Sequence, residues 1–324
     1  MSGVWIGLVA VVAVYFLLSL KSSRPDGTLL SVKPYRRLMF FIMPTRNESI
    51  VFFDAYVDAR RLIPYLEKAR EQFNGNLTHC AVAACGIGLA STRQMNRFTV
   101  GRRLYQRNAR WLTFSMKRRK TQDGFARRSS IATVKLDHQD GETFKAFCER
   151  INSDIRLNRS GKKTSTDQEF QLFNALPRPV LEPAARLVKW LDYNNLLPDF
   201  FIKGDPMFTS MFVANLGSLG MDDAFHHLYE YGTCPLFLTV GKLQDTVRVV
   251  DGKATVMPMV RLRFSYDERI ADGLNARYGI EAVVRVLEEP DQWLGCVEAD
   301  GSDTRPMWPR QDWESEDGAY MLRD

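Results

Sequence analysis

The spacing of hydrophobic residues changes near Phe208, and this change limits the folds that the chain can adopt. Before it, apolar residues recur mainly at helical spacing, which predicts helices at 58–73, 77–93, 142–158 and 177–198. Shorter β-rich stretches in this half predict strands at 50–55, 111–116 and 131–136. After it, stretches bounded by Gly, Asp or Pro predict an antiparallel meander of strands at 208–214, 236–241, 247–250 and 256–264. Helical spacing returns at 272–287. This grouping of helices and strands predicts an α+β fold and argues against an alternating parallel sheet.

Composition excludes several classes of protein. The chain has 324 residues, of which 45% are hydrophobic and 25% charged, so a collagenous, wholly disordered or polytopic membrane chain is excluded. The five cysteines form no Cys-x-x-Cys pair and lie in apolar runs, so neither a disulfide framework nor a metal site is expected. They are Cys80, Cys85, Cys148, Cys234 and Cys296. A reducing compartment fits them best.

The first twenty residues contain an uncharged apolar run from Gly3 to Leu20. As a helix, 18 such residues would span about 27 Å, close to the hydrocarbon thickness of a bilayer. We therefore expect a transmembrane anchor at 1–21, in preference to a cleaved signal peptide or a buried helix. Basic residues follow the run and none precedes it, which predicts a single-pass protein of the inner or plasma membrane with its C-terminal domain in the cytoplasm.

The rest of the chain divides by composition into three segments. Turn formers at 22–34 predict a juxtamembrane linker, and 35–290 is the expected folded domain. The segment 291–324 is acidic and contains Trp293, Trp308 and Trp313. This tail could dock a protein partner, be disordered, or pack on its own chain.

Positive charge is concentrated in the middle of the chain. From Arg93 to Arg128 there are twelve Lys or Arg and one acid, Asp123. The stretch is either a solvated surface or a site for a phosphate-rich cofactor or anionic head groups. No nucleic-acid-binding motif accompanies it, so nucleic acid is not an expected partner. The candidate phosphate-binding residues are Arg102, Arg103, Lys117, Arg118 and Arg119.

Two motifs carry a family resemblance. The first is Val-Ala-Asn-Leu-Gly-Ser-Leu-Gly at 213–220, and the second is Leu-Arg-Phe-Ser-Tyr-Asp-Glu-Arg-Ile-Ala-Asp-Gly at 262–273. Together they resemble the catalytic domain of the 2-oxoacid dehydrogenase acyltransferases, relatives of chloramphenicol acetyltransferase. That family has a Ser-Asn-Leu-Gly-like strand end and then a Ser-x-Asp-His-Arg-x-x-Asp-Gly motif at similar spacing.

The resemblance implies a fold and an assembly over about 35–290. It implies a chloramphenicol acetyltransferase-like α+β fold, with a mixed or antiparallel sheet and helices on one face. It also implies a homotrimer, in which coenzyme A or acyl-coenzyme A and a thiol acceptor enter a channel between subunits. No lipoyl group is expected on this chain, because no lipoyl domain or swinging linker precedes the domain.

The chain departs from the family at two catalytic positions. Glu268 stands where the family has its general-base histidine, and Ala214 where it has the serine that stabilises the oxyanion. Asp272 and Gly273 are retained with Asp267 and Arg269. We expect Asp272 to cap the following helix and Gly273 to permit a tight turn.

The size of these losses indicates what they do to the inherited reaction. A thiol has a pKa of about 8.5, an imidazole about 6.5 and a glutamate about 4.3. Proton transfer from the thiol is therefore unfavourable by about two pKa units when imidazole is the base, and by about four when glutamate is the base. The weaker base raises the activation free energy by roughly 3 kcal/mol, and the loss of one oxyanion donor raises it by a further ~3 to 4 kcal/mol. Added together, they slow transfer by about 10⁴- to 10⁵-fold. The inherited reaction is therefore expected to be lost, although whether the chain is an enzyme stays open.

Two histidines are alternative catalytic candidates. His226 and His227 follow the first motif, and histidine suits proton transfer. Adjacent residues point apart in extended chain, so at most one should face a given site. Both can equally have surface or packing roles. Glu268 is either a structural carboxylate paired with a nearby cation or a base whose pKa is raised.

These observations leave two hypotheses for the function. In the first, the chain is a scaffold, assembly protein or acyl-coenzyme A-binding pseudoenzyme that keeps the acyltransferase fold. In the second, it is an active acyltransferase of altered mechanism that uses Glu268 as base on a membrane-associated acceptor.

Overall fold

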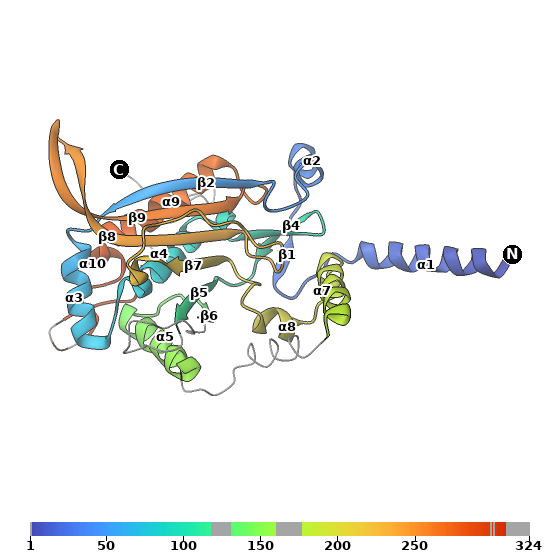
Figure 1. The fold of residues 1–324 in the computed structure, drawn as a ribbon, viewed down its shortest axis with the longest axis horizontal. Coiled ribbons are helices and arrows are strands. Elements are labelled where there is room, and N and C mark those ends of the chain that lie inside the picture. The colour runs from blue at the N-terminus through green and yellow to red at the C-terminus, as the bar shows by residue number, and fades with distance from the viewer. Residues whose placement is uncertain (1, 118–130, 160–176, 299, 301, 309–324) are drawn as a thin grey trace.

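A mixed sheet of six strands forms the centre of the molecule (Figure 1). A computed structural model describes residues 2–117, 131–159, 177–298, 300 and 302–308. The sheet has the order β2-β9-β8-β7-β5-β6. Its strands are β2 (Ile50–Asp58), β5 (Trp111–Lys117), β6 (Ile131–Asp137), β7 (Met211–Asn215), β8 (Leu236–Val250) and β9 (Lys253–Asp267). The expected α+β architecture is confirmed.

Helices cover one face of this sheet and form the main core with it. They are α3 (Leu62–Phe73), α4 (Leu77–Ser91), α5 (Phe144–Arg159) and α9 (Gly273–Glu288). In α4 almost every side chain is buried, as its apolar sequence predicts. The Asn76 side chain begins α4 by accepting hydrogen bonds from the backbone N–H groups of Thr78 and His79.

The path of the strands corrects one expectation about the sheet. β8 and β9 form a long antiparallel hairpin whose tip protrudes from the body, joined by a turn in which Asp251 and Gly252 have φ of 49° and 76°. However, β7 pairs in parallel with both β5 and β8, so the antiparallel meander expected for 208–264 is wrong. The reason is the long connection over 216–235, because it returns the chain to the end of the sheet at which β7 began before β8 starts.

A smaller sheet lies beside the first and includes the segment 22–34. It has the order β1-β4-β3, with β1 (Gly27–Leu29), β4 (Arg103–Arg107) and β3 (Arg97–Val100). Arg24 and Asp26 are buried next to Arg107, with Arg24 Nε donating to Asp26 Oδ1 at 2.8 Å and Arg107 Nη1 to Oδ2 at 3.1 Å. The domain boundaries stay a prediction, but 22–34 contributes both a strand and buried charges to the fold.

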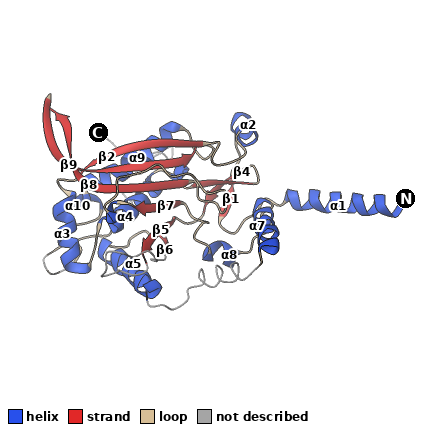
Figure 2. Ribbon diagram, viewed as in Figure 1, coloured by secondary structure: helices blue, strands red, loops and turns tan. Residues whose placement is uncertain are grey.

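The N-terminal helix requires a correction. α1 (Ser2–Leu20) extends away from the rest of the molecule (Figures 1 and 2). Across the part of the chain that the structure describes, no helix is both long enough and apolar enough to cross a membrane. The predicted transmembrane anchor at 1–21, membrane contact through 3–20 and single-pass localisation are therefore wrong.

The other helices that the structure describes lie at the edges of the fold. α2 (Pro34–Ile42) and α7 (Arg178–Tyr193) lie at the end of the molecule from which α1 leaves, and α8 (Asp199–Gly204) is close to α7. One-turn segments are found at α10 (Pro290–Trp293), Arg93–Met95 and Gly217–Leu219. α10 leads into the C-terminal segment.

The described part of the acidic tail packs on the domain. The side chains of Trp293 and Trp308 are buried and belong to the main core. The prediction that they dock a partner is therefore not supported, because a buried side chain presents no surface. Trp313 lies outside the described residues. All five cysteines are free; Cys296 is exposed and the other four are buried.

Candidate functional site

The second motif forms a tight loop between β9 and α9. Its Asp267 is completely buried and accepts hydrogen bonds from Ser49 Oγ at 2.8 Å and Thr99 Oγ1 at 3.1 Å. Arg269 forms a two-pronged pair with the same carboxylate, with Nε and Nη2 each 2.8 Å from an oxygen. Arg269 also donates to the carbonyl oxygen of Met43. These contacts fix the loop on the segment that precedes β2.

Glu268 lies between these two residues but has different surroundings. Its backbone N–H donates to the carbonyl oxygen of Ser49 at 2.9 Å, which holds the main chain in place. The side chain is half-buried. Its carboxylate makes no ion pair or hydrogen bond with any of the described residues. The structure therefore shows no structural ion pair that accounts for Glu268.

The two retained residues at the start of α9 behave differently from each other. Asp272 accepts a hydrogen bond from the backbone N–H of Asn275 at 3.0 Å, so it caps the helix as expected. Gly273 is the first residue of α9 and is not among the residues with positive φ. A Cβ atom there would meet nothing within 4 Å. The expectation that Gly273 permits a tight turn is therefore wrong, because its backbone conformation and surroundings would suit other residues.

The first motif ends β7 on the face of the sheet that the helices leave uncovered. Ala214 is half-buried and packs against a small cluster that contains Phe212 and Phe237. The segment 221–232 crosses this face, because Thr239 Oγ1 donates to the carbonyl oxygen of Ala224 and Asp223 pairs with Arg263. The motif position therefore presents a methyl group, which cannot donate a hydrogen bond to an oxyanion.

Both candidate histidines lie on the segment 221–232. The His226 ring stacks on Phe237, with ring centroids 3.9 Å apart and planes 5° apart. Burial lowers the pKa of His226. His227 also stacks on His226, at 4.6 Å between centroids, so the expectation that the two side chains point apart is wrong. The stacking is consistent with a packing role for His226.

Ala214 and Glu268 are far apart within one chain. Ala214 pairs with Thr239 of β8, which pairs with Arg263 of β9, and Glu268 follows Arg263 by five positions along the chain. With a rise of ~3.3 Å per residue and ~4.8 Å between strands, the two positions are roughly 19 Å apart. One chain therefore does not bring Ala214 and Glu268 into a single site.

Of the five candidate phosphate-binding residues, the structure describes the side chains of Arg102 and Arg103. Arg102 is exposed, and its guanidinium lies 4.6 Å from the centroid of the Phe41 ring. Arg103 donates instead to the carbonyl oxygens of Ser19 and Lys21. The main chain of Lys117 ends β5. Arg118 and Arg119 lie outside the described residues.

Sequence reasoning missed two charged residues near these positions. Asp223 bridges Arg261 and Arg263, and it could be found only once the segment 221–232 is placed on the sheet. Arg46 is buried beside the Asp267–Arg269 pair, and no motif marks it. In the described part of the chain, no group of three or more His, Cys, Asp or Glu side chains could hold a metal ion.

Comparison with known proteins supports the resemblance carried by the two motifs. Residues 207–295 match the model of the 2-oxoacid dehydrogenases acyltransferase (catalytic domain) family, and this range contains both motifs. The resemblance to that catalytic-domain family is therefore confirmed. A comparison with curated proteins finds no significant match.

Solved structures with the same fold extend over most of the chain. A probable dihydrolipoamide acetyltransferase from Listeria monocytogenes is 16% identical, with a TM-score of 0.52 over 81% of this chain and 94% of that one. The cubic core of a pyruvate dehydrogenase multienzyme complex is 14% identical, with a TM-score of 0.52 over 84% and 93%. The dihydrolipoamide acetyltransferase of Azotobacter vinelandii is 16% identical, with a TM-score of 0.51 over 81% and 93%. At these identities the similarity shows the fold alone.

Proposed function

We propose that this chain is an acyl-coenzyme A-binding or assembly protein on an acyltransferase fold, which has lost the family's acyl transfer. The observation that carries the proposal is the pair of substituted positions, Glu268 and Ala214, within two otherwise recognisable motifs. The retained Asp267–Arg269 pair and the Asp272 cap hold the loop in shape. The framework of the site is thus maintained without its two reactive groups.

We also propose that the chain works as a homotrimer. The roughly 19 Å between Ala214 and Glu268 supports this, because a site that uses both positions requires a second copy. The match to a protein of a multienzyme core is consistent with assembly. A ligand channel would then lie between copies, where the face crossed by 221–232 of one chain meets the β9–α9 loop of another.

One observation favours a second candidate function, an acyltransferase that uses Glu268 as base. Among the described residues, no cation or hydrogen-bond donor holds the Glu268 carboxylate, so it is free to accept a proton. A base of this kind would still lack an oxyanion donor from Ala214. An experiment must therefore separate binding from turnover.

Titration calorimetry of the full chain with coenzyme A and several acyl-coenzyme A esters tests binding. We expect micromolar binding without thioester loss, which would identify a binding protein. No binding at millimolar ligand would leave only the assembly role. Thioester loss that falls in Glu268→Gln but not in Glu67→Gln, an exposed glutamate of α3, would instead establish Glu268 as a base.

Restoring the family's residues gives a second test. The double variant Ala214→Ser, Glu268→His reinstates the oxyanion donor and the imidazole. If the framework is intact, we expect thioester loss to rise by at least about 10³-fold over the unmodified chain. No gain, with the coenzyme A affinity unchanged, would contradict the proposal that only these two groups were lost.

A further inference from the structure

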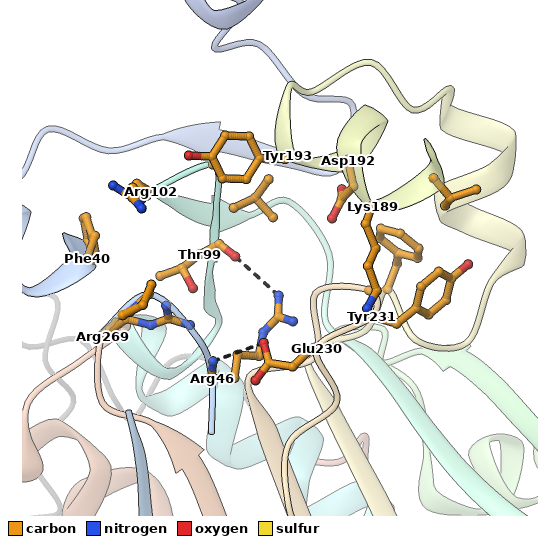
Figure 3. Close-up of a pocket in the computed structure, with 16 residues that line it drawn as sticks. Phe40, Arg46, Thr99, Arg102, Lys189, Asp192, Tyr193, Glu230, Tyr231 and Arg269 are labelled. Carbon is orange, nitrogen blue, oxygen red and sulfur yellow. Dashed lines mark hydrogen bonds between the residues drawn. The ribbon is translucent and has the colours of Figure 1, made fainter. Parts of the chain in front are cut away.

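A cavity of about 300 Å³ is lined by residues that include Arg46, Lys189 and Arg269 (Figure 3). It is open on one side and is bordered by the end of α2, the turn between β3 and β4, the last turns of α7 and the segment 230–232. Neither Ala214 nor Glu268 lines it. Its apolar walls include Phe40, Val188, Phe208 and the ring of Tyr231. The cavity can therefore hold a small molecule with an apolar body.

Arg46 provides the most unusual group in this cavity. Its side chain is only 6% exposed, and Figure 3 shows its guanidinium among the lining residues, directed toward Thr99. Nη1 donates to the carbonyl oxygen of Tyr229 at 2.9 Å and Nη2 to that of Thr99 at 3.4 Å. Within the described part of the chain, Nε has no hydrogen-bond partner. A buried cation thus has neutral partners and one unused donor.

The acids that line the cavity already have other partners. The Glu230 carboxylate accepts hydrogen bonds from the backbone N–H groups of Arg46 and Asn47 and from the Asn47 side chain. The Asp192 carboxylate is paired with Arg24, 2.9 Å away. Neither carboxylate forms an ion pair with the Arg46 guanidinium. The Arg46 guanidinium therefore has no ion-pair partner among the acids that line the cavity, and the nearby Asp267 carboxylate that also acts on it is already paired with Arg269.

Other cations line the same space. Arg102 and Lys189 approach from opposite walls, and Lys189 extends from α7 toward Tyr231 (Figure 3). Arg269 also lines the cavity, but it is paired with Asp267. The lining thus holds four cationic and two acidic side chains, and its charge favours an anion.

We propose that this cavity binds an amphipathic oxyanion, a carboxylate or phosphate on an apolar body, with Arg46 as the ligand of the anionic group. The guanidinium suits both oxyanions because its planar donors match their oxygens. The apolar body lies against the half-buried Val188 and Tyr231. The inference does not depend on coenzyme A binding, since it uses neither substituted position.

Calorimetry on the full chain tests this site with four probes: octyl phosphate, octanoate, inorganic phosphate and octanol. We expect octyl phosphate and octanoate to bind, octanol not to bind, and inorganic phosphate to bind more weakly than octyl phosphate. Equal affinities for octyl phosphate and inorganic phosphate would show that the site binds the anionic group alone and would overturn the part of the proposal that concerns the apolar body. Octanol binding as tightly as octanoate would overturn the proposal.

Variants locate the binding in the cavity. Arg46→Gln should weaken octyl phosphate binding at least about tenfold. Because a buried arginine can be needed for folding, Lys189→Gln serves as a second variant, with an expected loss of about threefold or more. Arg186→Gln is its control, since Arg186 is exposed on the same helix and paired with Glu182 outside the cavity. Equal effects of Lys189→Gln and Arg186→Gln, or displacement of octyl phosphate by coenzyme A, would refute a separate site.

Discussion

Asp267 and Glu268 are neighbours in the sequence with opposite environments. The Asp267 carboxylate is buried under donors from Ser49, Thr99 and Arg269, whereas that of Glu268 has no such partner among the described residues. A substitution at the second position therefore leaves the loop undisturbed. The side chain at position 268 can therefore vary without disturbing the contacts that hold Asp267 and Arg269.

Replacing Asp267 should have a large effect on folding. Asp267→Asn leaves the buried Arg269 guanidinium without its charged partner, which we expect to lower the free energy of unfolding by about 3–5 kcal/mol. Glu268→Gln, one position further on, should change it by less than about 0.5 kcal/mol. Urea unfolding of the two variants measures both. Equal losses would show that the loop depends on both carboxylates.

A second prediction concerns Asp26 and pH. Burial alone would raise the pKa of Asp26, but the nearby Arg107 and Arg24 reverse this and hold it below the ordinary value of 3.8. The Asp26 carboxyl therefore binds a proton more readily in the unfolded chain than in the folded one. The stability that the ionised Asp26 contributes is complete above about pH 4 and is lost as pH falls through the lower pKa of the folded state. The free energy of unfolding measured from pH 6 to pH 3 should fall less steeply in Asp26→Asn. A parallel fall in both proteins would contradict this assignment.

Sequence alone identified only some of these residues. Asp272 was recognisable as a cap, because a capping residue acts on the helix that follows it directly. Arg46 and Asp26 were not, since their roles depend on partners far away in the sequence, such as Tyr229 and Arg107. The charge of a residue is visible in the sequence, but its burial is not.

Among the elements, those defined by local pattern were predicted and those defined by pairing were not. The apolar pattern located α4 and α9 within a few residues. It missed β1, β3 and β4, because strands of three to five residues are too short to show a clear alternation, and they are stabilised by pairing with one another. The parallel pairing of β7 with β8 was also missed, since strand direction depends on the path of the connection over 216–235.

The packing of α4 provides a prediction at this level. A Cβ atom on Gly86 would lie 2.0 Å from the ring of His138 at the end of β6. Although alanine favours helix, Gly86→Ala should therefore lower the free energy of unfolding by about 1–3 kcal/mol. The control is Gly273→Ala, where the added methyl meets nothing and the change should be neutral or stabilising by up to about 1 kcal/mol. Thermal unfolding compares them, and a stabilised Gly86→Ala would show that His138 moves freely.

For the whole molecule, the main prediction is its assembly. If the site requires Ala214 of one copy and Glu268 of another, sedimentation should give the mass of three 37.2 kDa chains at micromolar concentration. Diluting the protein until it dissociates should then abolish coenzyme A binding. A single-chain mass together with undiminished coenzyme A binding would contradict the shared site.

The base of α1 has a mechanical consequence for the molecule. The carbonyl oxygen of Lys21 accepts hydrogen bonds from the side chains of Arg103 and Asn195. The carbonyl oxygen of Ser22 accepts one from the Tyr105 hydroxyl. Arg24, just beyond, is buried and paired with Asp192 of α7. The base of α1 is therefore fixed to the domain. A force applied to the free end of the helix would be transmitted directly to β4 and α7, because no flexible linker lies between them.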